Sequence, residues 1–313
     1  MYGARTVSVA RIRAAIGLKE GDTISRETFD RAAMEKRIRS VPGIRQANIT
    51  LVCCDDKEGR SILYTGVSEA DGEVYPYHDR PAGAYKLDSV IVQTYRRYEQ
   101  VWMDAVKAGQ AEENNEQGHV LLTYPPAASL QDSFVVYAAS HVPLLRQVIR
   151  ESGNAEQRQI AAWIIAYTSD KSKVIDDLLY AAADPDETVR NNATRALAVI
   201  ARYAPAHSSS ANIVPAAPFL KMIHSIIWTD RNKALMLLEA LTSDRDSTVL
   251  QKLKTEALPE LEEMARWKNP GHASFAVFLL GRIADISDQE IFFTSDGNKQ
   301  TVIDGWMKKI SGQ

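Results

Sequence analysis

The stretch DPDETVRNNATRALAVIA, residues 184–201, decides the fold of this 313-residue chain. Asp184 and Asp186 flank Pro185, and carboxylates at such positions accept hydrogen bonds from the free amides of a helix start. Behind them, apolar residues recur at helical spacing, and several are alanines that let neighbouring helices approach closely. The stretch therefore predicts an interhelix turn, with Asp184, Pro185 and Asp186 as turn and cap, followed by a buried helix.

The same pattern occurs four times in the C-terminal half of the chain. Its copies lie at residues 144–169, 174–201, 219–241 and 258–284. An arginine stands at the same position in the first three copies, as Arg158, Arg190 and Arg231. Helix pairs that repeat every ~30 to 45 residues are typical of α-helical solenoids, because a single pair cannot bury its apolar stripe alone.

Residues 143–285 resemble HEAT repeats, most closely within residues 184–201. The resemblance implies an all-α HEAT-type solenoid over residues 143–313, with a C-terminal cap helix near residues 298–310. It also implies an extended concave face that suits a protein or peptide partner. The three repeated arginines have two alternative roles: a ladder of bonds inside the stack, or a basic strip that contacts a partner.

Residues 5–70 predict a small α/β unit with the order β-α-α-β-β. The expected elements are a strand at 6–9, a helix at 10–16, a second helix that starts at Ser25, and strands at 44–54 and 61–67. Gly17 is placed to end the first helix. Ser25 is the expected start of the second helix because its hydroxyl can cap free amides, and Thr28 follows three residues later. The fold class is therefore α+β, with this unit preceding the solenoid.

Several motifs within residues 5–70 resemble a POTRA domain, the polypeptide-transport-associated module of envelope proteins. They are, in chain order, Gly21-Asp22, Val41-Pro42-Gly43-Ile44, Ala47 and Glu69. The resemblance implies a periplasmic or otherwise extracytoplasmic protein, with the cytoplasm as the alternative because HEAT repeats occur on both sides. It also implies that the edge of the small sheet can add a strand from a partner.

Between these two regions the sequence predicts a linker and a helical connector. Residues 71–86 hold prolines, glycines and tyrosines and are typical of a linker that lies over a surface. Residues 87–142 predict a connector that packs at the N-terminal end of the solenoid and begins with a long amphipathic helix. Within it, residues 110–127 form a polar, proline-bearing loop that is either functional or disordered.

Composition argues against several classes of partner. The chain carries 37 Lys and Arg against 40 Asp and Glu, a net charge of -3, so we expect no nucleic acid partner. No run approaches the ~18 apolar residues of a membrane span, so no transmembrane segment is expected. Cys53 and Cys54 are adjacent, and a bridge between neighbours is strained. We therefore expect two free thiols and, without spaced pairs, no metal site.

The sequence contains no common catalytic or nucleotide-binding motif, such as GxGxxG, GxxxxGK[ST] or GxSxG. Its six histidines share no metal-binding spacing. We therefore expect neither enzyme activity nor a cofactor, but a non-catalytic scaffold that binds an unidentified protein or peptide. Two alternatives stay open. One is an architectural spacer in a bacterial envelope complex, and the other is a HEAT-like enzyme of the bilin lyase or alkyl-base DNA glycosylase kind.

Overall fold

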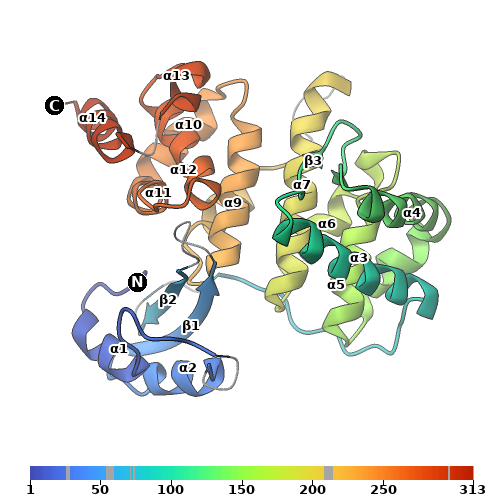
Figure 1. Cartoon of the computed structure of the whole chain (residues 1–313), viewed down its shortest axis with the longest axis horizontal. Coiled ribbons are helices and arrows are strands. Elements are labelled where there is room, and N and C mark those ends of the chain that lie inside the picture. The colour runs from blue at the N-terminus through green and yellow to red at the C-terminus, as the bar shows by residue number, and fades with distance from the viewer. Residues whose placement is uncertain are drawn as a thin grey trace. The chain divides into compact units, whose positions relative to one another are not determined.

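The computed structural model describes residues 1–25, 29–53, 60–70, 72, 75–207, 214–294 and 297–312. Most of these residues are helical, and a small antiparallel sheet lies near the N-terminus (Figure 1). The chain forms two compact units. Unit 1 contains residues 1–75, 220–235 and 247–313, and unit 2 contains residues 76–219 and 236–246.

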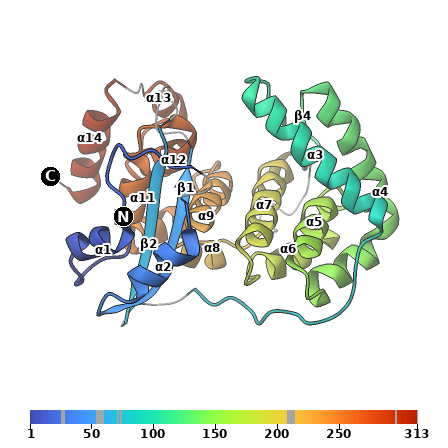
Figure 2. The same ribbon diagram turned by 60° about the horizontal axis from the view of Figure 1, so that its bottom comes forward.

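The N-terminal part of unit 1 packs two helices on a two-stranded sheet (Figure 2). Helix α1 (Val9–Ile16) and helix α2 (Arg31–Arg39) precede strands β1 (Ile44–Val52) and β2 (Ile62–Glu69), which pair antiparallel. Gly17 ends α1 in the left-handed conformation, at a φ of 77°, which favours glycine. Apolar side chains from all four elements form the core: Ile12, Ile16, Met34, Ile38, Ile44, Ala47, Ile49 and Val67.

The strand expected at residues 6–9 is wrong, because α1 already begins at Val9. The physical reason is the side chain of Glu69, at the end of β2. Its carboxylate accepts the backbone N–H groups of residues 5–7 at 2.6, 2.8 and 2.9 Å, so these amides do not pair with a strand. The Thr6 hydroxyl, followed by these amides, lowers the pKa of the Glu69 carboxyl to about 2.

Helix α2 begins later than the sequence indicates. Asp30 caps it in place of Ser25, since the Asp30 carboxylate accepts the backbone N–H of Ala33 at 2.9 Å. The Ser25 carbonyl instead accepts the N–H of Phe29 at 3.0 Å, and both residues precede the helix. Thr28, the expected partner of Ser25 in the cap, lies outside the described residues.

The rest of unit 1 is helical, with α12 (Pro270–Ile283) at its centre. Around α12 pack α10 (Ser247–Glu256), α11 (Leu258–Ala265), α13 (Asp288–Phe292) and α14 (Lys299–Ser311). Helices α11 and α12 occupy the fourth predicted copy, and α14 occupies the position of the expected cap helix. Helix α10 has no counterpart among the expected elements. Strand β2 contacts this part, because the Tyr64 hydroxyl accepts a hydrogen bond from Arg231 at 3.0 Å.

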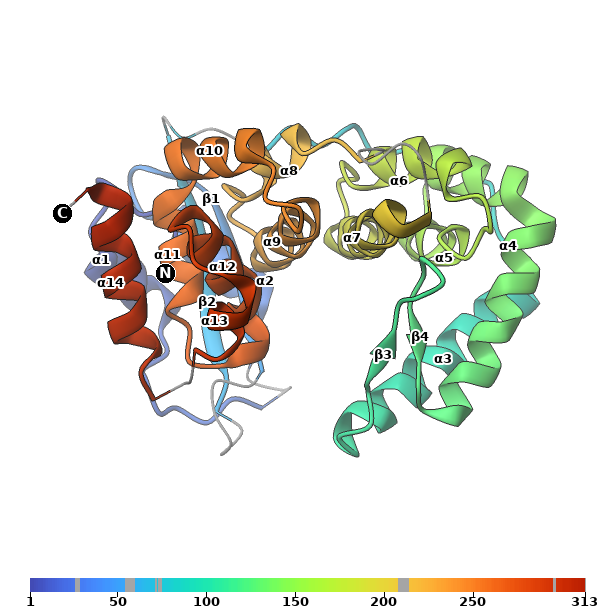
Figure 3. The same ribbon diagram turned by 90° about the horizontal axis from the view of Figure 1, so that it is seen from above.

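Unit 2 contains successive helix pairs (Figure 3). Its elements are α3 (Ser89–Lys107), β3 (Glu113–Asn114), β4 (Leu121–Leu122), α4 (Pro125–Glu151), α5 (Ala155–Ile165), α6 (Ile175–Ala181) and α7 (Glu187–His207). The second half of α4 with α5 is the first helix pair, and α6 with α7 is the second. Because α4 packs on α6 and α5 packs on α7, the two pairs form two layers. Helices α8 (Ala217–Met222) and α9 (Trp228–Leu241), whose residues are divided between the two units, occupy the third predicted copy.

The segment that precedes the first pair is more ordered than the sequence indicates. The loop expected at residues 110–127 contains the short hairpin β3–β4, and α4 starts within it at Pro125, a residue suited to a first helical turn. Helix α4 then bends at His141, whose φ of -127° and ψ of 18° are not helical. Pro143 follows the bend and opens the helix of the first pair.

None of the helices in the described ranges is both long enough and apolar enough to cross a membrane.

We expect Gly66→Ala to destabilise the protein by about 1–3 kcal/mol, because the new Cβ would lie 1.8 Å from the carbonyl oxygen of Ile226. Gly305→Ala in α14 is the control, since a Cβ there meets nothing within 4 Å. This control should raise the free energy of unfolding by about 0.5–1 kcal/mol, because alanine favours a helix. Urea denaturation measures both changes. A Gly66→Ala protein as stable as the wild type would contradict the close contact.

Glu69 makes part of the stability depend on pH. A carboxyl whose pKa is lowered on folding stabilises the fold at every pH above its unfolded pKa. This contribution is lost as the pH falls toward the folded pKa, which is about 2 for Glu69. Glu69→Gln should therefore be less stable than the wild type at neutral pH, and the difference should shrink from about pH 5 to about pH 2. Urea midpoints across this range measure the difference. A difference that does not change with pH would show that Glu69 does not titrate there.

Candidate binding site at the helix turns

The turn between α6 and α7 is organised by Asp184, whose side chain is fully buried. Its carboxylate accepts hydrogen bonds from Arg158 of α5, at 2.7 and 2.8 Å, and from the backbone N–H of Asp186, at 2.8 Å. Its backbone carbonyl accepts a bond of 2.7 Å from Arg190 of α7. One residue therefore ties the second helix pair both to the first pair and to its own second helix.

Asp186 and Pro185 complete this turn. The Asp186 carboxylate accepts the backbone N–H groups of Thr188 and Val189, at 2.9 and 3.2 Å, which satisfies two free amides at the start of α7. Pro185 stands between the two aspartates and is exposed. The turn thus presents a proline to solvent, while both carboxylates bind groups of the protein itself.

The repeated arginines of unit 2 are buried, with exposed fractions of 1% for both Arg158 and Arg190. Arg158 donates to the carbonyl of Ser152 at 2.8 Å, just as Arg190 donates to that of Asp184. In both cases the acceptor lies six positions earlier, in the turn that precedes the arginine's helix. The two helix pairs therefore use the same arginine-to-turn bond.

Arg231, the third repeated arginine, lies in unit 1 and is 0% exposed. It donates to the Ile223 carbonyl at 3.2 Å and to the Tyr64 hydroxyl at 3.0 Å, and pairs with the Glu263 carboxylate at 2.8 Å. The Tyr2 ring lies 3.8 Å from its guanidinium carbon. Burial raises the pKa of the Tyr64 hydroxyl to about 12, so this group stays neutral beside the arginine. Direct contact between any of the three arginines and a partner stays a prediction.

An extended segment of unit 2, residues 76–87, lies along the turns of both helix pairs (Figure 2). We call it the strap. His78 donates its backbone N–H to the carbonyl of Ala183, in the second turn, at 2.9 Å. Gly83 exchanges two backbone hydrogen bonds of 2.8 Å with the first turn, residues 151–153. The strap therefore binds two successive turns mainly through backbone groups.

Two further residues fasten the strap near the first pair. Leu87, its buried end, donates its backbone N–H to the Gln157 side chain at 2.7 Å. Arg80 donates to the backbone of the first turn at 2.9 Å. The backbones approach so closely that a Cβ on Gly83 would lie 2.5 Å from the Glu151 carbonyl oxygen, and this position therefore needs glycine.

Two rings of the strap rest on the second helix pair. The Tyr77 ring lies 4.0 Å from the guanidinium carbon of Arg190, a cation–π contact. The His78 ring stacks on Tyr180, with centroids 4.1 Å apart and planes 18° from parallel. Nε2 of His78 lies 3.9 Å from the Asp184 carboxylate, which is too far for a hydrogen bond. These rings cover the same residues that build the turn.

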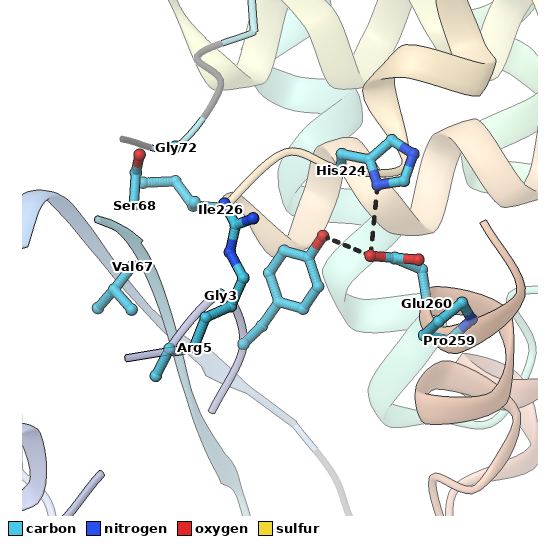
Figure 4. Close-up of a pocket in the computed structure, with 11 residues that line it drawn as sticks. Gly3, Arg5, Val67, Ser68, Gly72, His224, Ile226, Pro259 and Glu260 are labelled. Atoms are coloured by element: carbon cyan, nitrogen blue, oxygen red, sulfur yellow. Dashed lines mark hydrogen bonds and ion pairs between the residues drawn. The ribbon is translucent and has the colours of Figure 1, made fainter. Parts of the chain in front are cut away.

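Unit 1 contains a pocket of about 640 Å³ beside Tyr2 (Figure 4). At its wall, the Glu260 carboxylate accepts a hydrogen bond from the Tyr2 hydroxyl at 3.2 Å and lies 3.3 Å from Nδ1 of His224. Burial alone would raise the pKa of the Glu260 carboxyl, but the hydrogen bond and charge of His224 lower it below its ordinary value. Sequence reasoning missed this pair because its members are far apart in the chain and belong to no motif.

A second polar cluster, in unit 2, joins Lys171 to His119. Nζ of Lys171 donates to the Ala166 carbonyl at 2.7 Å and lies 3.0 Å from Nδ1 of His119. Burial lowers the pKa of Lys171 to about 8, and burial together with the Lys171 charge lowers that of His119 to about 4. A lysine with a lowered pKa can act as a nucleophile, but both partners hold this one inside the protein. The cluster fastens the loop before β4 to the turn after α5.

The described part of the chain contains no group of three His, Cys, Asp or Glu side chains that could hold a metal ion. Cys53 is disulfide-bonded, so the free thiol expected at this position is wrong. Cys54 lies outside the described residues.

Sequence reasoning predicted the arginines, the turn and a linker that lies over a surface, but not which surface the strap covers. The prolines and glycines of residues 71–86 indicate a linker, and no periodic pattern shows where an extended segment lies. One usable signal was present. Tyr77 and His78 are adjacent rings in a polar segment, and exposed rings in a linker are typical of a segment that packs on a surface.

We expect the buried Arg158–Asp184 pair to be strongly coupled. Removing one partner leaves the other charge buried and unpaired, so Arg158→Met and Asp184→Ala should each cost about 3–5 kcal/mol. The double variant should lose much less than the sum of the two single variants. The exposed pair Arg96–Glu156, at 2.7 Å, is the control and should couple by less than about 1 kcal/mol. Double-mutant cycles by urea denaturation measure both couplings, and additive losses at the buried pair would contradict the expectation.

Residues 142–214 match the family model of HEAT repeats. The matched segment contains the first and second helix pairs, and with them Arg158, Asp184 and Arg190. A comparison of the chain with curated proteins gives no match. Over the two pairs that carry the strap, the chain is therefore similar to HEAT repeats.

Proposed function

We propose that this protein is a non-catalytic scaffold that binds a protein or peptide partner at the turns of its HEAT-like helix pairs. The strap is the main support, because residues 76–87 lie on two successive turns as an extended polypeptide held by backbone hydrogen bonds. Such bonds give affinity for a peptide, while side-chain contacts give specificity. HEAT repeats, which residues 142–214 match, are commonly interaction scaffolds.

A second observation favours the turns over the layer formed by α5 and α7. Helix α3 lies across this layer, and the Tyr95 hydroxyl accepts hydrogen bonds from Gln159 of α5 and Asn192 of α7, at 3.4 and 3.2 Å. The β3–β4 hairpin adds an ion pair between Glu113 and Arg195 of α7. One face of the layer is thus occupied by the chain itself. A partner site on an extended concave face stays a prediction from the HEAT resemblance.

We assign the three repeated arginines to the ladder rather than to a basic strip that bonds to an anionic partner. Arg158, Arg190 and Arg231 are each at most 1% exposed, and each donates to a backbone carbonyl near a turn. A buried guanidinium cannot donate its N–H groups to an anionic partner without breaking these bonds. In this proposal the arginines shape the turns, and a partner binds the surface that they hold in place.

The wider assignments from the sequence are part of the same proposal. They comprise the HEAT-type solenoid over residues 143–313 with its cap helix, the POTRA-like unit at residues 5–70, the connector at residues 87–142, and an extracytoplasmic location. The packing of α1 and α2 on the β1–β2 sheet supports the POTRA-like unit. So does Glu69, a residue of the resemblance, which binds the amides before α1.

Site-specific photo-crosslinking in cells that express the full chain tests the proposed function. A photoreactive amino acid at Pro185, which is exposed in the second turn, should give an adduct with one specific protein. The same amino acid at Lys107, whose side chain is 73% exposed at the end of α3, is the control and should not. The architectural-spacer alternative predicts no adduct at Pro185. Absence of that adduct, or equal labelling at both positions, would count against a scaffold that uses its turns.

A further inference from the structure

We propose that the strap occupies the partner site until a partner displaces it. The partner then binds through an extended segment of its own, which carries an aromatic residue followed by a second planar ring. This inference rests on the proposed scaffold function and adds the chemistry of the partner. Three observations carry it: the backbone contacts of the strap, the rings that cover the second turn, and the weak hold on the strap as a whole.

The backbone contacts define the shape of the replacing segment. The N–H of His78, both backbone groups of Gly83 and the N–H of Leu87 bind the two turns and α5. Any extended polypeptide can supply these groups. At the position of Gly83 it must also supply glycine, because a Cβ there would meet the Glu151 carbonyl oxygen. The site therefore selects an extended backbone with a glycine five positions after the second ring, at Gly83 in the strap.

The side-chain contacts define its chemistry. Tyr77 covers the guanidinium of Arg190, which is otherwise closed off within the turn. A replacing segment must cover this cation again, and an aromatic face does so favourably. Tyr180 offers a flat ring on which His78 stacks nearly parallel. A planar side chain is therefore required directly after the aromatic residue.

The strap is held weakly enough to exchange. Leu87 is the only buried residue among residues 76–87, and the rest are half-buried or exposed. Nε2 of His78 is shielded from water and has no hydrogen-bond partner in the described part of the chain. An unpaired buried polar atom and few apolar contacts are typical of a segment that opens at low cost. A partner that satisfies these groups better can take the place of the strap.

The same contact recurs independently in unit 1. There residues 1–3 lie beside β2, where the N–H of Tyr2 donates to the Thr65 carbonyl at 2.9 Å and its carbonyl accepts from the N–H of Val67 at 3.0 Å. The Tyr2 ring covers Arg231 at 3.8 Å. In both units an extended segment thus places a tyrosine on a repeated arginine. The recurrence indicates that a tyrosine ring on a repeated arginine is a general way to hold an extended segment in this protein.

A labelled peptide tests the inference on the full chain. The probe is fluorescein-labelled YPYHDRPAGAYKL, the sequence of residues 75–87, and its affinity is measured by fluorescence anisotropy. In the wild type the tethered strap competes at an effective concentration in the millimolar range. The full-chain double variant Tyr77→Ala/His78→Ala should therefore bind the probe at least about tenfold more tightly. Lys86→Ala, at an exposed strap position, should bind it as the wild type does.

A second variant keeps the test valid if the double variant Tyr77→Ala/His78→Ala does not fold. Gly83→Ala weakens a different contact of the strap, because the new Cβ would meet the Glu151 carbonyl oxygen, and it should likewise raise the affinity for the probe. A probe with both rings replaced by alanine should not bind either variant. Equal affinity of the wild type and both folded strap variants, or no saturable binding to either variant, would overturn the inference. If the Pro185 adduct persists in that case, the scaffold function stands and the partner binds at the turns with another chemistry.

Discussion

A guanidinium group taken out of water costs several kcal/mol unless its N–H groups find acceptors, and the turns of this protein are built around that requirement. Arg158 meets it with the carboxylate of Asp184 and the carbonyl of Ser152. The two acceptors belong to different turns, so Arg158 holds the first and second helix pairs in register. Arg190 repeats the bond within the second pair. Small apolar residues can then pack between the helices, because the polar groups at the turns are already satisfied.

The same arginines explain why extended segments lie where they do. A buried cation still presents a flat face, and a tyrosine ring is a favourable cover for it. Tyr77 covers Arg190 in unit 2, and Tyr2 covers Arg231 in unit 1. The chemistry that stabilises the turn thus also makes it a surface for a polypeptide. In the scaffold that we propose, fold and binding depend on one set of contacts.

Sequence patterns predicted the helices well where a period was present and poorly where single side chains decided the outcome. The first two helix pairs appear where the repeat places them, because the apolar stripe and the Asp184–Asp186 turn are local features. The strand at residues 6–9 does not form, since the decisive acceptor, Glu69, stands more than sixty positions away. Helix α10 was not predicted because it lies between two copies of the repeat. The hairpin β3–β4 is too short to show a strand period.

By itself the sequence determined the first two helix pairs, which arginines recur, and that a turn lies at residues 184–186. These follow from spacing and capping, which act over a few residues. Only the tertiary structure decided what covers the arginines. The strap, Tyr2 and Tyr64 reach them from segments far away in the chain. Their positions depend on backbone hydrogen bonds, which hold the strap on the turns, Tyr2 beside β2, and Tyr64 in the β1–β2 sheet. Such bonds use groups that nearly every residue carries, so they leave no pattern in the sequence.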